Sequence, residues 1–179
     1  MTSRTRLLLA AVALVIVGGA AGLYWFQPWK LFTDSSVNEA LPEVAATVLP
    51  PSASAAPVPE PQNVLLATGS LISHEHESSG DVRLIRLADG RVQLTLENLA
   101  TSEGPDLRVW LSNAPVIEGE AGWHVFDDDR YVELGALKAN HGNQVYDVPA
   151  GTDLTGLDSV TIWCKRFSVS FAAAALAKV

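Results

Sequence analysis

The sequence predicts an all-β fold, an antiparallel β-sandwich or barrel-like domain, preceded by one transmembrane helix and a disordered linker. Three observations support this. Residues 7–26 form an uncharged apolar run, residues 27–63 are rich in proline, and residues 64–179 contain short runs of alternating hydrophobicity separated by glycine and proline. About twenty apolar residues suffice to span a bilayer as a helix. Many short alternating runs are typical of sandwiches and barrels. Residues 1–6 remain as a short cytoplasmic N-terminus.

The apolar run is interpreted as a retained signal anchor. Arg4 and Arg6 precede it and only Lys30 follows closely, a bias that places the N-terminus in the cytoplasm and the C-terminal domain outside the cell membrane. A cleaved signal peptide is the alternative, but it would have a shorter apolar region that ends at a small-residue cleavage site. The small residues at 20–22 do not fit, because the apolar stretch continues past them into large aromatic residues.

The segment that follows the apolar run is predicted to be a linker. It lacks the periodicity needed to bury one face, and its prolines favour extended, polyproline-like conformations. At roughly 3 Å per residue, such a linker could hold the domain several tens of ångströms from the bilayer. The prolines are Pro28, Pro42, Pro50, Pro51, Pro57, Pro59 and Pro61.

The C-terminal part reads as one compact β-domain. Two alternating runs lie on either side of Asp89-Gly90, which is a two-residue hairpin signal. Further along, Val160, Ile162 and Cys164 share one face of a predicted strand. No window shows sustained helical periodicity. The residues from Phe171 to Leu176 are expected to complete the last strand and to pack on the core.

Composition and charge restrict the function. The net charge is −8, and residues 64–179 alone carry nine Lys or Arg against sixteen Asp or Glu. Such a surface repels a phosphate backbone, which excludes nucleic acid as a partner. We expect the bilayer, contacted through the N-terminal helix, and redox or other proteins of the cell envelope as partners. Hydrolase, transferase and nucleotide-binding motifs are absent from the sequence, which argues against an enzyme.

Ordered sequence blocks carry a resemblance across almost the whole domain. The chain from 69 to 176 resembles the electron-transfer DM-thirteen domain, a module of exported bacterial proteins that also occurs beside DOMON domains, here as a membrane-anchored bacterial member. The resemblance implies a β-rich fold and a redox role centred on the cysteine of the Trp-Cys block, with no cofactor attached, so the cofactor is unknown. The blocks are residues 76–80, 87–90, 96–98, 104–107, 109–112, 134–138, 142–146 and 160–164, with Pro149, Phe167 and Phe171.

Cys164 has two interpretations. It is the only cysteine, so it cannot form an internal disulfide, and as a thiolate it could carry redox chemistry or bind a cofactor. Lys165 and Arg166 follow it directly and could lower its pKa if the site is open. Against this, its strand face is shared with Val160 and Ile162, and free cysteines are among the most buried residues.

His76 and Asp106 are the candidate supporting residues. His74 and His76 would place both rings on one face of an extended segment, which is a metal-ligand spacing, and copper accepts His together with Cys. However, neither His nor Met follows Cys164, unlike in cupredoxins. No metal is therefore assigned, and His76 and Cys164 are the candidate ligands. Asp106 could orient His76 or accept a proton, although Asp at a turn more often bonds its own backbone.

Two functions follow from these residues. The first is a membrane-anchored extracytoplasmic β-domain with an electron-transfer role centred on Cys164 and supported by His76 and Asp106. The second is a non-catalytic binding or scaffold module of the cell envelope, in which Cys164 is a buried core residue. Trp110, Trp123 and Trp163 could relay electrons, but tryptophans in small β-domains usually fill the core.

Overall fold

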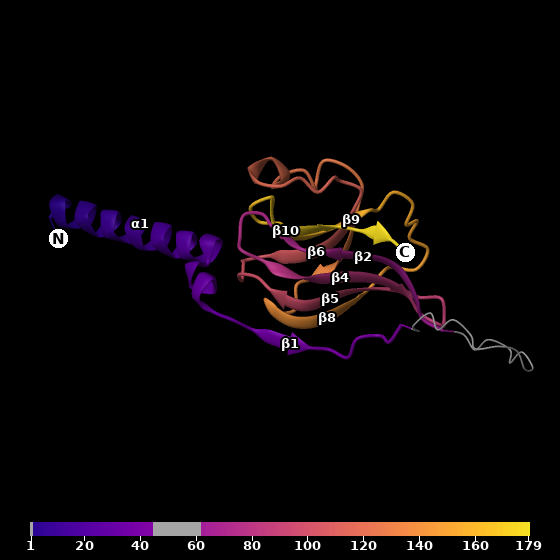
Figure 1. Ribbon diagram of the computed structural model, residues 1–179. Helices are drawn as coiled ribbons and strands as arrows, with labels where there is room; N and C mark the ends of the chain where they lie inside the picture. The colour runs from indigo at the N-terminus through magenta and orange to yellow at the C-terminus, as the bar shows by residue number, and fades with distance from the viewer. Residues whose placement is uncertain (1, 45–61) are drawn as a thin grey trace, which may run out of the picture.

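The computed structural model describes residues 2–44 and 62–179 (Figure 1). They form one long helix, two short 3-10 helices and eleven strands. The helices are α1 (Ser3–Phe26), η1 (Pro28–Phe32) and η2 (Glu120–Gly122). The strands are β1 (Ser36–Asn38), β2 (Val64–Ser70), β3 (Ile72–Ser73), β4 (Ser79–Arg86), β5 (Val92–Ala100), β6 (Leu107–Ser112), β7 (Tyr131–Ala136), β8 (His141–Asp147), β9 (Ser159–Cys164), β10 (Val169–Ala175) and β11 (Ala177–Lys178).

The long helix has the character predicted for the apolar run. The span Ser3–Lys30 contains 28 residues with a mean hydropathy of 2.4, and none of its apolar window is buried against the rest of the chain. Figure 1 shows α1 in indigo, projecting away from the strands. Its length and composition make it a candidate membrane span, and the helix itself is confirmed.

The strands form two sheets that share one core. The first has the order β1-β8-β5-β4-β2-β11 and the second the order β3-β10-β9-β6-β7. Their pairings are antiparallel except that of β1 with β8, which is parallel. The core takes buried side chains from both sheets, including Leu84 and Leu94 from the first and Val109 and Ile162 from the second. The predicted all-β fold is therefore a sandwich.

The hairpin predicted at Asp89-Gly90 joins β4 to β5. Its loop is one residue longer than the two-residue signal indicated, because the amide of Leu87 donates to the carbonyl of Arg91 over 2.8 Å and leaves residues 88–90 in the turn. Gly90 has φ +88°, the left-handed conformation that closes a three-residue hairpin loop and that glycine adopts without strain.

Part of the predicted linker lies in the sheet. Residues 36–38 form β1, which pairs with the edge of β8. The side chain of Asn140, which is 1% exposed, accepts a hydrogen bond from the amide of Ser35 over 2.7 Å and donates to the carbonyl of Thr101. A segment without alternating hydrophobicity is thus fixed by polar contacts to its backbone. The remainder of the predicted disordered linker, residues 45–61, lies outside the described residues.

The end of α1 contacts the turn between β9 and β10. The guanidinium of Arg166 donates to the carbonyls of Tyr24 and Trp25, at 3.1 and 2.8 Å. The Phe26 ring stacks on Phe167 with centroids 5.9 Å apart. These contacts cap free carbonyls at the helix C-terminus, so the β-domain lies directly beside the end of α1 rather than tens of ångströms away from it.

Candidate functional site

Cys164 is the last residue of β9 and points into the sandwich. Its backbone pairs with Leu107 of β6 and Val169 of β10, and its side chain is 0% exposed within the core. The alternation predicted for β9 is confirmed, because Val160 and Ile162 belong to the same core. The thiol is therefore shielded from dissolved reagents.

The environment of the sulfur has opposing effects on its ionisation. Burial raises the pKa of the Cys164 thiol, and the negative charge of Glu75 adds to this rise. Backbone hydrogen bonding from Phe167, Arg166 and Asp106 acts in the opposite direction and lowers the pKa, because it stabilises a negative charge on the sulfur. Burial dominates, so Cys164 is a thiol at neutral pH.

The cations that follow Cys164 do not act on it in the way the sequence suggested. The Lys165 ammonium binds the carboxylate of Glu133 at 3.1 Å, and the Arg166 guanidinium binds the end of α1. Of these two residues, only Arg166 acts on the pKa of the thiol, and it does so through its backbone and not through its charge. A strand that ends at the thiol must turn immediately, and this turn directs both basic side chains outward.

His76 is half-buried beside the core. Its ring packs on the ring of Phe171 with centroids 3.9 Å apart, and its Nε2 lies 3.7 Å from a carboxylate oxygen of Glu75. Burial lowers the pKa of His76, and the Glu75 charge partly offsets this. Phe171 shares the core with Cys164, so the structure connects His76 to the cysteine through an aromatic ring; within the described ranges no hydrogen bond joins the two.

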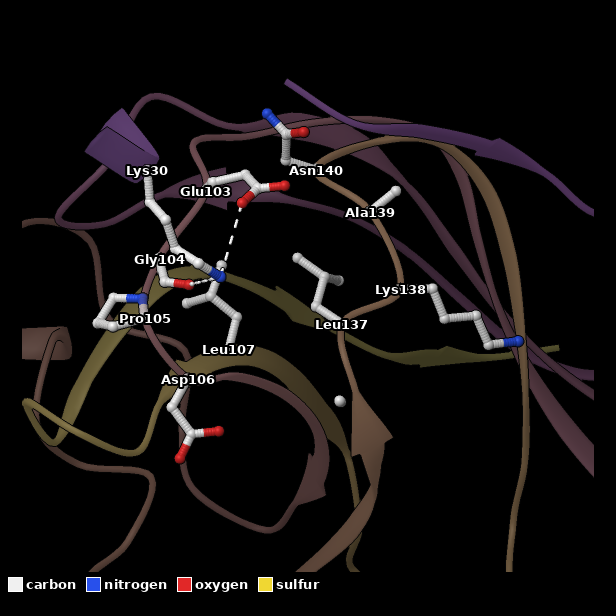
Figure 2. Close-up of a pocket in the computed structure, with 11 residues that line it drawn as sticks. Lys30, Glu103, Gly104, Pro105, Asp106, Leu107, Leu137, Lys138, Ala139 and Asn140 are labelled. Carbon is white, nitrogen blue, oxygen red and sulfur yellow. Dashed lines mark hydrogen bonds and ion pairs between the residues drawn. The ribbon is translucent and has the colours of Figure 1, made fainter. Parts of the chain in front are cut away.

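Asp106 approaches Cys164 through its backbone. Its carboxylate accepts a hydrogen bond of 2.7 Å from Nε of Arg108, while its carbonyl accepts one from the amide of Lys165 at 3.0 Å. Figure 2 shows the Asp106 carboxylate pointing away from Lys30 and Glu103. The carboxylate is therefore committed to Arg108, and Asp106 influences the thiol through its backbone, which lowers the pKa of Cys164.

The expected shared face of His74 and His76 is wrong. Both residues lie in a bend after β3, not in an extended strand, so the period of two does not apply. The buried His74 ring meets Ser170 Oγ at 2.8 Å and lies 6.0 Å from Phe126, while His76 packs on Phe171. Among residues 2–44 and 62–179, no group of three or more His, Cys, Asp or Glu is arranged to hold a metal ion.

Two cavities lie where the domain meets the end of α1. The one in Figure 2 has a volume of about 260 Å³, and Lys30 crosses it to reach the carbonyl of Gly104 at 3.1 Å and the carboxylate of Glu103 at 3.7 Å. The second, of about 280 Å³, is bordered by His76 and Phe171 together with Phe26 at the end of α1. His76 of the candidate site therefore lies beside a cavity that also borders the C-terminal end of α1.

Some residues around the site gave no signal in the sequence. The pairing of His76 with Phe171 brings together residues far apart in the chain, and the backbone hydrogen bonding to the sulfur depends on the turn after β9. The hydroxyl of Ser170, which bonds His74 and the Thr161 hydroxyl, was also missed. Alternation identifies which face of a strand is buried, but not which distant residues meet there.

The folded domain matches the model of a known protein family. The model described as Electron transfer DM13 matches residues 70–176, which covers more than half of the chain and includes Cys164, His76 and Asp106. No curated protein and no solved structure matches the chain. The resemblance read from the sequence blocks is confirmed. The chain belongs to the electron-transfer DM13 family.

Proposed function

We propose that this protein is a membrane-anchored, extracytoplasmic electron carrier whose redox group is Cys164. Membership of the electron-transfer DM13 family supports a redox role. The observation that carries the assignment to one residue is the position of Cys164, the single cysteine of the sequence, which is buried at the end of β9 inside the matched domain. Backbone hydrogen bonding from Asp106, Arg166 and Phe167 partly offsets the rise in the pKa of its thiol, and polar groups around a sulfur are one means by which proteins adjust the potential of sulfur centres.

The proposed step moves one electron and one proton. The Cys164 thiol gives an electron to a one-electron acceptor and a proton to solvent that reaches the sulfur by local opening of the domain. The resulting thiyl radical returns to the thiol when it takes an electron from the next donor and a proton from solvent. His76 and Asp106 act as positioning residues. His76 packs against Phe171 beside the core, and the backbone of Asp106 lowers the pKa of the thiol while Arg108 fixes its carboxylate. The cofactor, if the centre has one, is unknown.

The proposed location is the outer face of the cell membrane. The apolar helix and the basic residues before it favour an anchor whose N-terminus lies in the cytoplasm. The contact of Arg166 with the last carbonyls of α1 supports this location, because with α1 in the bilayer it would keep the domain beside the membrane surface. Protease added to intact cells should release the β-domain, whereas a mature N-terminus near Leu23 in the native host would refute the retained anchor.

A binding or scaffold module of the cell envelope is the alternative function. It is favoured by the complete burial of Cys164 and by the upward shift of its pKa, since a structural cysteine needs neither exposure nor a thiolate. In that case the acidic surface of the domain would contact envelope proteins, and Cys164 would be a small apolar core residue.

One set of measurements on the full-length protein in lipid nanodiscs separates the two functions. The optical spectrum and metal content are recorded, and the thiol is alkylated with and without denaturant. Cys164→Ser keeps the shape of the side chain but removes the thiol chemistry, whereas Cys164→Ala keeps a small apolar group. A redox centre predicts that Cys164→Ser folds but no longer exchanges electrons. A scaffold predicts that Cys164→Ser unfolds the domain while Cys164→Ala does not.

A further inference from the structure

A second buried aromatic group lies on the outer face of the sheet that contains β9. Trp110, Phe126 and Trp163 form a cluster with Ala114 and Ala173, separate from the core between the sheets. The connection from β6 to β7, which contains η2, lies over this face in Figure 1. The cluster is therefore sealed from solvent by a loop on one side and by the sheet on the other.

Three oxidisable rings cross this face on a diagonal over neighbouring strands. Trp163 of β9 lies 5.1 Å from Trp110 of β6, at an interplanar angle of 27°. Trp110 lies 3.9 Å from Tyr131 of β7, at 8°. Diagonal neighbours on adjacent strands are within reach of aromatic side chains, and here each ring stacks on the next. The rings thus form a continuous line from the centre of the sheet to its edge.

The two ends of this line differ in exposure. Trp163 is 1% exposed and is bonded in sequence to Cys164, whose side chain occupies the opposite face of β9. Tyr131 is 40% exposed and lies on β7, the edge strand of the sheet. The line therefore connects the strand that carries the proposed redox residue with a surface that a partner can contact.

Trp110 has an unusual polar environment. Its Nε1 is buried and has no hydrogen-bond partner among the described residues. A buried donor without a partner is costly, and such a group requires an explanation, for which a redox role is one of the recognised reasons. An indole that loses an electron becomes a strong acid. With no acceptor near Nε1 it keeps its proton, so the positive charge passes to the next ring instead of being trapped as a neutral radical.

We propose that Tyr131, Trp110 and Trp163 form a path for one-electron transfer between β9 and the surface at β7. A one-electron acceptor at the surface takes an electron from Tyr131, whose phenolic proton goes to water. The Tyr131 radical regains an electron from Trp110 and a proton from water, and the Trp110 radical cation takes an electron from Trp163. The assignment of the Cys164 thiol as the donor that reduces oxidised Trp163 rests on the proposed function. The path through the three rings does not depend on that assignment.

Packing requires aromatic rings on this face but not oxidisable ones. Phe126 is an aromatic member of the same cluster that has no N–H group, and its ring lies 6.3 Å from that of Trp163. Phe126 cannot be oxidised by a mild acceptor, and it lies 6.0 Å from His74, which bonds Ser170 of β10, on the other side of β9 from β6. Within this cluster the oxidisable rings therefore lie toward the exposed edge.

The test injects an oxidising equivalent beside Tyr131. In the full-length chain, exposed Asp128 is replaced by cysteine and labelled with a ruthenium polypyridyl complex; buried Cys164 does not react. Flash–quench oxidation of the ruthenium should then produce the absorption of a tryptophan radical. In a Trp110→Phe background the radical yield should fall at least about tenfold, the change that an added barrier of about 1.4 kcal/mol produces. Tyr131→Phe should slow its formation.

The matched control is Trp123→Phe. Trp123 also has a buried Nε1 without a partner among the described residues, but its ring belongs to none of the stacked pairs, so the radical yield should not change. A yield that is equal in native and Trp110→Phe proteins, with folding confirmed by circular dichroism, would overturn the path and leave the role of Cys164 untouched. If the radical forms but its lifetime is the same in Cys164→Ala, the path stands and the proposed function loses its donor.

Discussion

The two faces of β9 are both buried, but by different means. Val160, Ile162 and Cys164 face the opposite sheet and belong to the hydrophobic core between the two sheets. Thr161 and Trp163 face the other way, where the connection between β6 and β7 covers them. Antiparallel sheets commonly leave one face in water. The strand that carries the proposed redox residue is therefore insulated on both sides. Its inner layer holds the Cys164 thiol among apolar side chains, and its outer layer holds hydroxyl groups and oxidisable aromatic rings.

The largest expected loss of folding stability comes from a substitution on the outer face of β9. Trp163→Ala removes a fully buried indole and should destabilise the domain by about 3–5 kcal/mol, because the cluster cannot collapse around so large a void. Denaturant unfolding followed by circular dichroism measures the change. Trp29→Ala, at an exposed residue near the end of α1, is the control. A cost below that of Cys164→Ala would mean that the loop, and not the ring, seals this face.

Ser170→Ala tests the polar part of the same face. The Ser170 hydroxyl bonds Nδ1 of His74 and the hydroxyl of Thr161, both at 2.8 Å. Its removal leaves buried groups without partners and should cost about 1–3 kcal/mol of unfolding free energy. Amide hydrogen exchange should show faster exchange in β10 and in the bend at His74. Val169→Ala, on the inner face of β10, is the matched change that removes only apolar contacts; unaltered exchange in Ser170→Ala would contradict the network.

A smaller loss of folding stability is expected from a substitution on the inner face of β9. Cys164→Ala removes one sulfur from the core and should cost about 1–2 kcal/mol. The same unfolding measurement gives the value. If this variant is destabilised as strongly as Trp163→Ala, the inner core depends on Cys164 more than its contacts indicate.

The two faces should also respond to opposite ends of the pH scale. Burial lowers the pKa of His74, so below about pH 6.5 the unfolded chain binds a proton that the folded chain does not, and stability falls as the solution is acidified. Burial raises the pKa of Cys164, so above about pH 9 the unfolded chain loses a proton that the folded chain keeps, and stability falls as pH rises. Each slope is at most about 1.4 kcal/mol per pH unit.

Two substitutions test which residue causes each pH dependence of stability. His74→Asn keeps a partner for Ser170 and should reduce the acidic slope, and Cys164→Ala should reduce the alkaline slope. Denaturant titrations at a series of pH values measure both. An acidic slope that is unchanged in His74→Asn would assign it to other groups, His76 among them.

The comparison also shows what the sequence could predict. Strict alternation at Val160, Ile162 and Cys164 was enough to assign the inner face of β9, and Asp89-Gly90 was enough to locate a hairpin. The cover over Trp163 could not be predicted, because it comes from a loop without periodicity. The segment that forms β1 is bound in part by one buried side chain, Asn140, 105 positions away from the amide of Ser35 that it accepts a hydrogen bond from. Contacts of this kind are set by the tertiary structure and leave no local pattern.

The same limit applies to the candidate site. Cys164, His76 and Asp106 were selected by residue type and by the family blocks, but their relation in space differs from the expected cluster of side chains. His76 packs on Phe171, and the Asp106 carboxylate binds Arg108, so that Asp106 acts on the thiol through its backbone. The bend at His74 removes the strand geometry on which the paired-histidine interpretation depended.

Protein-film voltammetry of the full-length chain tests the central claim most directly. If Cys164 is the electron-carrying group, the native protein should give a one-electron wave that Cys164→Ser abolishes, while the free energy of unfolding stays within about 1 kcal/mol of the native value. A wave of unchanged potential and size in well-folded Cys164→Ser would show that the electron resides elsewhere, and Cys164 would then be a core residue only.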